Sequence, residues 1–289
     1  MKNRVYPLIL MLLAIVAGIF VTGYVVSARS PHVNSEETKN RTTSQNPSPN
    51  LVKLPQQLNI ETTATYPHDT KSFTQGLEFH DGNLYEGTGN YGNSKLRRVE
   101  LKTGKVLQEI SLPQQYFGEG ITIFGDKIYQ LTWQENICFV YDKKTFQQLH
   151  SFPYRGEGWG MTNDGTHLIV SNGTSTLQFF DPKTFQVVKT LDVREGDRKI
   201  TQLNELEYIH GEIWANVWET NFIVRINPAS GQVIGWIDCS GFVPKGIAKN
   251  DRERVLNGIA FDPATNRIFI TGKFWPVMYE WQLHEESEK

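Results

Sequence analysis

The hydrophobic pattern of residues 56–289 consists of short apolar segments that alternate with turns. Five segments share one order, an apolar stretch, a turn and a second β-rich stretch, and they begin at Gln75, Glu119, Trp159, Asn204 and Asn257. The first four turns suit tight hairpins; they are Asp81-Gly82, Gly125-Asp126, Asp164-Gly165 and His210-Gly211. The fifth turn, Pro263–Asn266, is two residues longer. Each segment therefore predicts a β-hairpin.

Further β-rich stretches follow these hairpins. The third stretches are 95–101, 137–142, 176–181, 222–227 and 277–282, and the fourth are 105–110, 146–152, 185–191 and 232–238. The last repeat has no fourth stretch, and residues 58–66 can supply one. The repeats start 44, 40, 45 and 53 residues apart, and four-stranded units of about 40–50 residues are typical of β-propellers.

We therefore expect an all-β fold, a five-bladed β-propeller with four-stranded blades, whose last blade is closed by an N-terminal strand. The alternative is a β-sandwich or two β domains. It is less favoured because no linker interrupts residues 56–289.

The first 55 residues differ from this pattern. Lys2 and Arg4 precede an apolar run, Val5–Val26, and a span of about 20 apolar residues can cross a bilayer. The run ends in Val26-Ser27-Ala28, which resembles a signal-peptidase site. Residues 1–28 are thus a cleaved signal peptide or an uncleaved membrane anchor, and either predicts an extracytoplasmic protein. Residues 29–55, rich in Ser, Thr, Asn and Pro, predict a flexible tether.

The composition of the chain argues against several classes of function. The net charge of −2 gives no basic surplus for nucleic acid. Two cysteines exclude a disulfide scaffold and a four-cysteine zinc module. Because Cys138 and Cys239 lie in blades that are not adjacent, we expect two unpaired thiols. No histidine pair has metal-ligand spacing. Glu205 and Glu207 share one strand face, so a cation in the channel stays open as a weaker possibility.

The repeat geometry places polar residues at one mouth of the central channel. The start of the first strand and the end of the second meet at one end of each hairpin. Trp133 and Trp218 follow Gly120 and Glu205 by 13 residues each, and in the fifth repeat the corresponding offset is 15 and reaches Lys273. The predicted mouth therefore holds Glu119, Lys273, Gln75, Asn204 and Asn257, walled by Trp133, Trp159, Trp218 and Trp275. Singly, such residues are usually core or rim, but together they predict a site for a small polar ligand.

Eight short motifs occur in order along the blades. They are Ser72–Leu77, Phe117–Gly120, Leu131–Trp133, Gly156–Met161, Leu203–Glu207, Ala215–Trp218, Leu256–Gly258 and Thr271–Pro276. In this combination the chain resembles the glutamine cyclotransferases of the plant and bacterial type over residues 56–289. The resemblance implies a five-bladed propeller that converts N-terminal glutamine of peptides and proteins to pyroglutamate, with release of ammonia and without a catalytic metal or other cofactor.

The resemblance also implies roles for individual residues. It makes Glu119 the general base and acid, and it matches Phe73, Gln75, Phe117, Trp133, Trp159, Asn204, Trp218 and Lys273 to active-site positions. Lys273, with Gln75 or Asn204, would hold the oxyanion. The expected partners are Gln-initiated peptides, together with a membrane if residues 5–26 are retained; no nucleic acid partner is expected, and the enzyme is expected to be a monomer.

Two other classes of function stay open at this point. A non-catalytic propeller that binds peptide N-termini or a protein partner would keep the aromatic mouth, but it would not need Glu119 and Lys273 together. A lactonase-like propeller hydrolase would need a channel cation held by carboxylates and amides, and chelators would inactivate it.

Overall fold

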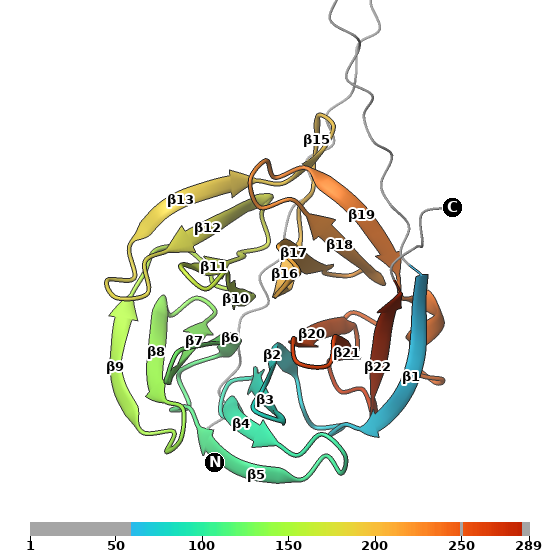
Figure 1. The fold of residues 1–289 in the computed structure, drawn as a ribbon. Coiled ribbons are helices and arrows are strands. Elements are labelled where there is room, and N and C mark those ends of the chain that lie inside the picture. Colours follow the sequence, from blue (N-terminus) through green and yellow to red (C-terminus); the bar gives the residue numbers. More distant parts are fainter. Residues whose placement is uncertain (1–58, 249–250, 285–289) are drawn as a thin grey trace, which may run out of the picture. The chain divides into compact units, whose positions relative to one another are not determined.

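The strands form five four-stranded antiparallel sheets around a common centre (Figure 1). The structure is a computed structural model, and it describes residues 59–248 and 251–284. In the described part, the innermost strands of neighbouring sheets contact one another, so the sheets are the blades of a five-bladed propeller. The predicted fold is confirmed.

The blades follow one another along the chain. Blade 1 contains β2 (Thr74–His80), β3 (Asn83–Thr88), β4 (Lys95–Val99) and β5 (Val106–Ser111). Blade 2 contains β6 (Gly118–Phe124), β7 (Lys127–Thr132), β8 (Ile137–Asp142) and β9 (Gln148–Pro153). Blade 3 contains β10 (Met161–Asn163), β11 (Leu168–Val170), β12 (Thr176–Phe180) and β13 (Val187–Asp192).

The remaining elements complete the ring. Blade 4 contains β16 (Leu203–Ile209), β17 (Glu212–Val217), β18 (Phe222–Ile226) and β19 (Val233–Asp238). Blade 5 contains β20 (Leu256–Asp262), β21 (Arg267–Gly272), β22 (Val277–His284) and β1 (Asn59–Pro67). A short hairpin, β14 (Arg194–Glu195) with β15 (Arg198–Lys199), and a 3₁₀ turn, η1 (Ser240–Phe242), lie outside the blades and were not predicted.

Turn chemistry explains two of the inner hairpins. Asp81-Gly82 has φ values of 49° and 78°, and His210-Gly211 has 49° and 81°. Two successive positive φ values are the geometry of a type I′ turn, whose twist matches that of the flanking strands. Glycine at the second position adopts this conformation without a Cβ clash.

Blade 5 closes the ring with both ends of the described chain. β1 pairs antiparallel with β22, from Asn59 opposite His284 to Pro67 opposite Val277. The predicted closing strand, residues 58–66, is therefore found one residue further along. Because β1 joins the last blade and then leads into β2 of blade 1, residues 68–73 connect the last and first blades.

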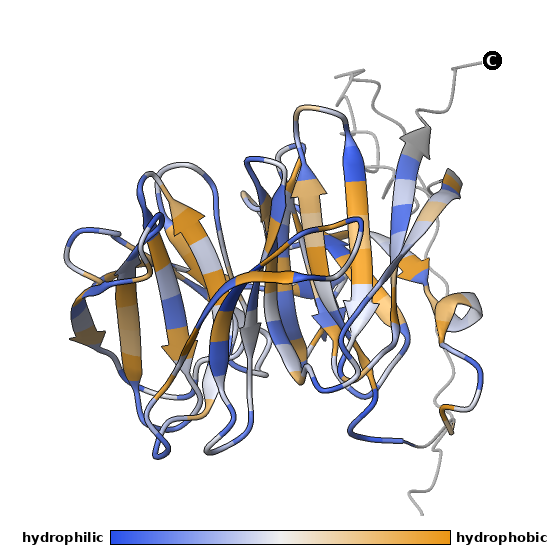
Figure 2. Ribbon diagram, turned by 90° about the horizontal axis from the view of Figure 1, so that it is seen from below, coloured by the Kyte–Doolittle hydropathy of each residue, from blue (hydrophilic) through white to orange (hydrophobic). Residues whose placement is uncertain are grey.

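The hydrophobic core is divided between the blades. Five buried clusters fill the five interfaces between adjacent blades. The strands in Figure 2 carry alternating apolar and polar bands, as expected when each sheet face packs against a neighbour. Cys138 and Cys239 lie in different clusters, and both are buried free thiols, as predicted.

Several predictions for the N-terminal part fall outside the described residues. These are the signal peptide or anchor, the tether and the domain boundaries at residues 28 and 55. Within residues 59–248 and 251–284, no helix is long and apolar enough to cross a membrane.

Candidate active site

A β-bulge marks the start of the innermost strand in four blades. The strand register shifts between Thr74 and Gly76, between Gly118 and Ile121, between Leu203 and Leu206, and between Leu256 and Ile259. These bulges contain the polar residues Gln75, Glu119, Asn204 and Asn257. A bulge adds one residue and re-aims its side chain. The repeated bulge therefore explains why polar residues occupy this position in an otherwise buried strand.

The second strand of each hairpin returns to the same end of the blade. Trp133 N donates to Phe117 O at 2.9 Å, and Lys273 N donates to Val255 O at 2.9 Å. Trp218 N likewise donates to Gln202 O at 2.8 Å. The residue after each second strand is thus held beside the start of the first, as the repeat spacing predicted.

Nine of the eleven predicted site residues line one cavity of about 330 Å³, and Asn257 and Trp275 do not. Its walls are formed by Phe73, Gln75, Asn90, Phe117, Glu119, Trp133, Trp159, Asn204, Trp218, Glu253, Lys273 and Phe274. The nine residues matched through the family resemblance are all among them. Asn257 lies directly behind the wall, where its Nδ2 donates to Gln75 Oε1 at 3.2 Å.

The expectation that Trp275 walls the cavity is wrong. Trp275 is 0% exposed and packs in the cluster between blades 4 and 5. Phe274 adopts φ 59°, which turns the chain, and Phe274 lines the cavity instead. The Trp275 ring covers Gly272 so closely that a Cβ there would lie 2.3 Å from the indole.

Three lining residues were missed by the sequence reasoning: Asn90, Glu253 and Phe274. Asn90 belongs to the loop between β3 and β4, and Glu253 belongs to the segment before β20. Neither occupies a repeat position, so the spacing argument had no signal for them. Phe274 stands next to Lys273 and could have been considered in place of Trp275.

Glu119 is the buried carboxylate of the cavity, with 3% exposure. Its Oε1 accepts a hydrogen bond from Gln75 Nε2 at 2.9 Å, and its Oε2 has no hydrogen-bond partner among the described residues. Burial raises the pKa of Glu119 well above its usual range, an effect that Lys273 opposes and the charges of Glu157 and Glu135 reinforce. Oε2 is therefore free to exchange a proton with a ligand.

Lys273 supplies a buried cation, with 4% exposure. Its ammonium lies 4.4 Å from the centroid of the Phe73 ring, within cation–π range. Burial lowers the pKa of Lys273 to about 8, although the charge of Glu119 favours the protonated form. A cation and a carboxylate thus face one small cavity.

Amides and aromatic rings complete the surface. The bond from Asn257 fixes the Gln75 amide, so that its nitrogen faces Glu119. The Asn204 Oδ1 atom is buried and has no partner among the described residues, which leaves it able to accept a bond from a ligand. Phe117 meets Trp133 edge-on with ring centroids 5.7 Å apart, and Trp159 meets Trp218 at 5.5 Å.

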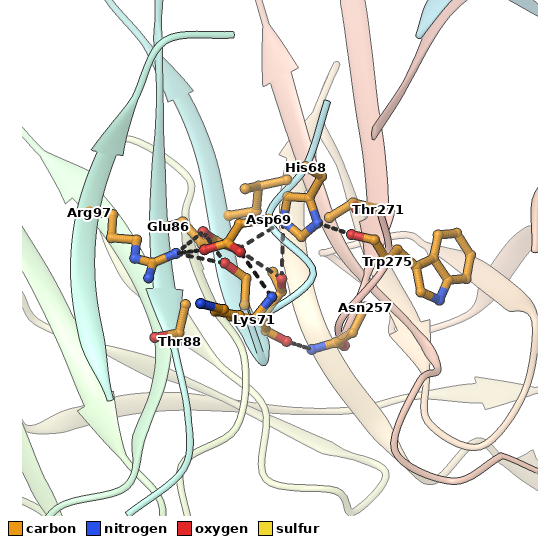
Figure 3. A network of polar contacts seen from close by, with 12 residues as sticks. His68, Asp69, Lys71, Glu86, Thr88, Arg97, Asn257, Thr271 and Trp275 are labelled. Atoms are coloured by element: carbon orange, nitrogen blue, oxygen red, sulfur yellow. Dashed lines mark hydrogen bonds and ion pairs between the residues drawn. The ribbon is translucent and has the colours of Figure 1, made fainter. Parts of the chain in front are cut away.

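A polar network centred on the buried Glu86 carboxylate contacts the segment that precedes and begins β2 (Figure 3). Ser72 Oγ and Thr74 Oγ1 donate to the Glu86 carboxylate at 3.0 and 2.8 Å. The network thus holds Ser72 and Thr74, while Phe73, which lies between them, and Gln75, which lies in the bulge, line the cavity.

The same network reaches the Lys273 loop. His68 Nε2 lies 3.0 Å from Glu86 Oε1, and His68 Nδ1 donates to Trp275 O at 2.7 Å. Phe274 N donates to Ser72 O at 2.7 Å. For His68, burial alone would lower the pKa, but Glu86 raises it overall. Burial alone would raise the pKa of Glu86, but the charge and the hydrogen bond of His68 lower it overall. The pair thus joins both segments that line one side of the cavity.

We expect Glu86→Gln to destabilise the fold by about 3–5 kcal/mol, because removing one partner of a buried pair leaves the other uncompensated. The ionised Glu86 contributes to the free energy of unfolding at pH values above its pKa in the unfolded chain, and this contribution is lost as the pH falls through its lowered pKa in the folded protein. The protonated His68 contributes at pH values below its pKa in the unfolded chain, and this contribution is lost as the pH rises through its raised pKa in the folded protein. The loss of unfolding free energy in Glu86→Gln relative to wild type is therefore expected to be largest between about pH 4.5 and 6.5. Chemical denaturation of both proteins across this pH range measures it.

Glu109→Gln is the matched control, since Glu86 and Glu109 both form ion pairs with Arg97, at 3.9 and 3.3 Å, but Glu109 is partly exposed. It is expected to cost less than about 1 kcal/mol. An equal loss of unfolding free energy in the two variants would show that the buried network stabilises the fold no more than the exposed ion pair does.

Glu205 and Glu207 lie elsewhere in the inner strand of blade 4. Glu205 accepts backbone hydrogen bonds from Leu77 N at 3.1 Å and Ile259 N at 2.8 Å, and Glu207 accepts one from Phe261 N at 2.8 Å. Burial raises the pKa of both carboxyls well above the usual range. They thus tie blade 4 to blades 1 and 5. Within the described part of the chain, no three His, Cys, Asp or Glu side chains form a group that could hold a metal ion.

Comparisons with known proteins agree with this architecture. Residues 33–283 match the family model described as glutamine cyclotransferase. The chain is 43% identical over 235 residues to glutaminyl-peptide cyclotransferase of Arabidopsis thaliana, covering 80% of this chain and 73% of the plant protein. It is also similar to the crystal structure of Myxococcus xanthus glutaminyl cyclase, with a TM-score of 0.72, 36% identity, and coverage of 78% of this chain and 96% of that one. The chain therefore belongs to the glutamine cyclotransferase family.

Proposed function

We propose that this protein converts the N-terminal glutamine of peptides and proteins to pyroglutamate, with release of ammonia. The observation that carries the proposal is the Oε2 atom of buried Glu119, which has no hydrogen-bond partner in the described part of the chain, while Glu119 lines the same small cavity as Lys273. The cavity is lined by aromatic rings and a few directed polar groups, which suits a single polar side chain. Membership of the family supports the same activity.

The reaction needs no nucleophile from the enzyme. The α-amine of the substrate attacks its own side-chain amide carbon, the new C–N bond forms, and the bond to the side-chain nitrogen breaks. Glu119 accepts a proton from the amine and delivers it to the departing nitrogen, so one carboxylate acts as base and then as acid. A raised pKa suits this double role, because the best acid–base group titrates near the working pH.

Lys273 stabilises the oxygen of the tetrahedral intermediate. A cation in a water-poor cavity stabilises developing negative charge more strongly than one in bulk water. Asn204 and Gln75 line the same cavity and bind the polar groups of the substrate. The aromatic walls hold the glutamine side chain folded toward its own amine, which raises the effective concentration of the two reacting groups.

The proposed chemistry is complete without a metal ion, and its test is a chelator experiment. The enzyme is incubated with a Gln-initiated peptide whose side-chain amide carries ¹⁵N, with and without EDTA. We expect all of the released ammonia to carry ¹⁵N, and we expect it to be released at the same rate with and without EDTA. Loss of activity with EDTA, restored by a divalent cation, would contradict a metal-independent reaction.

We further propose that the enzyme works outside the cytoplasm on exported peptides or proteins. The support is the apolar run Val5–Val26 behind Lys2 and Arg4, which suits a signal peptide or anchor. If this segment stays uncleaved, it attaches the enzyme to the membrane. Fractionation of cells that express the full chain tests this location, and recovery only in the cytoplasm would contradict it.

A further inference from the structure

One carboxylate bridges two aromatic walls of the cavity. Glu157 Oε2 accepts hydrogen bonds from Trp133 Nε1 at 2.8 Å and from Trp159 Nε1 at 2.9 Å. Its other oxygen accepts a bond from Gln134 Nε2 at 3.0 Å. Trp133 follows the second strand of blade 2, and Trp159 precedes the first strand of blade 3. Glu157 therefore joins the wall residues of two neighbouring blades.

The two indoles need such a partner. An indole N–H only donates, so each ring can be held at its polar edge by a single acceptor. Hydrogen bonds to an ionised carboxylate are stronger than those between neutral groups. Although burial alone would raise the pKa of Glu157, hydrogen bonds from Trp159, Gln134 and Trp133 lower it overall. Glu157 is thus ionised at neutral pH and holds both rings with charge-assisted bonds.

Glu157 stands behind the wall rather than in it, since it is not among the residues that line the cavity. Its partners Trp133 and Trp159 do line the cavity. Its effect on a ligand must therefore pass through the orientation of these rings and through its charge.

We propose that Glu157 is a positioning residue that fixes Trp133 and Trp159 as the walls against which the substrate glutamine folds. This inference rests on the proposed function. A loose wall lets the side chain leave the conformation in which amine and amide carbon meet, and misplacement of about 1 Å can cost about 10²-fold in rate.

The charge of Glu157 has a second, separable consequence. The charge of Lys273 lowers the pKa of Glu119, and the charges of Glu157 and Glu135 raise it. The charge of Glu119 in turn raises the pKa of Tyr91 and of Tyr154. Removing either outer carboxylate, Glu157 or Glu135, should lower the pKa of Glu119. The acidic limb of the pH–rate profile then moves to lower pH in both variants.

Glu135→Gln is therefore the matched control for charge. Glu135 accepts bonds from Tyr91 and from Phe117 N and makes no bond to either indole. The full-length chain is compared with Glu157→Gln, Glu157→Ala and Glu135→Gln by steady-state kinetics across pH. We expect kcat/KM to fall about 10–100-fold in Glu157→Ala and less in Glu157→Gln, whose neutral amide oxygen can still accept hydrogen bonds from the indoles. Glu135→Gln should show the shifted acidic limb without this loss.

An independent readout follows the indoles directly. In ¹⁵N-labelled protein, the Nε1–H resonances of Trp133 and Trp159, assigned with Trp→Phe variants, should move upfield in Glu157→Ala and stay in place in Glu135→Gln. Should Glu157→Ala fail to fold, the same comparison is made with Glu157→Gln. Wild-type cyclisation with unchanged kinetics and unchanged indole resonances in the Glu157 variants would overturn the inference. A wild-type enzyme that does not cyclise would instead contradict the proposed function, and the indole shifts would still report whether Glu157 holds the rings.

Discussion

Glu119→Gln is expected to lower kcat/KM for a Gln-initiated peptide by about 10²–10⁴-fold, the usual cost of losing a general acid–base group. The amide has nearly the shape of the carboxylate but cannot carry the proton from amine to leaving group. It can still pair with the Gln75 side chain, which now donates to Glu119 Oε1. The substitution also removes a charge whose burial is unfavourable. The fold should therefore persist while the reaction fails.

The measurement is steady-state kinetics on wild type and variant, with circular dichroism and thermal unfolding to check the fold. Glu109→Gln makes the same chemical change on a strand outside the cavity and should retain normal turnover. If Glu119→Gln folds and turns over at close to the wild-type rate, Glu119 is not the proton carrier.

Replacing Lys273 with methionine should lower kcat by about 10²–10³-fold, the typical cost of removing one donor from an oxyanion site. Methionine keeps much of the aliphatic length of the lysine side chain but has no charge. Because Lys273 opposes the rise in the pKa of Glu119, its removal should raise that pKa further. The acidic limb of the pH–rate profile then moves to higher pH, opposite to the shift expected for the Glu157 variants.

The alkaline limb supplies the second signature of Lys273. The group has a pKa of about 8, so it loses its charge as the pH rises through that value. Wild-type kcat should decline over this range, and Lys273→Met should lack the decline. A variant with an unchanged alkaline limb would show that another group stabilises the oxyanion.

The architecture could be predicted because its signal is periodic. Hairpin turns such as Asp81-Gly82 and His210-Gly211 recur in repeats that start 40–53 residues apart, and each turn returns the second strand beside the first. The equivalence of Trp133, Trp218 and Lys273 follows from this register alone. The same regularity predicts that Glu119 and Lys273 lie at one mouth of the channel, although 154 positions separate them in the chain.

What could not be predicted depends on local geometry and on distant contacts. The positive φ of Phe274 sends Trp275 into the core, and no turn residue such as glycine marks that position. The bond between His68 and Trp275 spans 207 positions, so no local sequence pattern marks it. Glu157 was visible only as part of a family motif, because its role requires two indoles to meet on one oxygen atom.

The most direct test of the central claim is the mass of a Gln-initiated peptide after incubation with the purified full-length chain. The account predicts a product lighter by one ammonia, formed faster than in the enzyme-free reaction and blocked to further Edman degradation. A product in which the side-chain amide has become a carboxylic acid would indicate hydrolysis in place of cyclisation. A peptide that is bound but unchanged in mass would identify the cavity as a binding site for peptide N-termini, and either result would contradict the account.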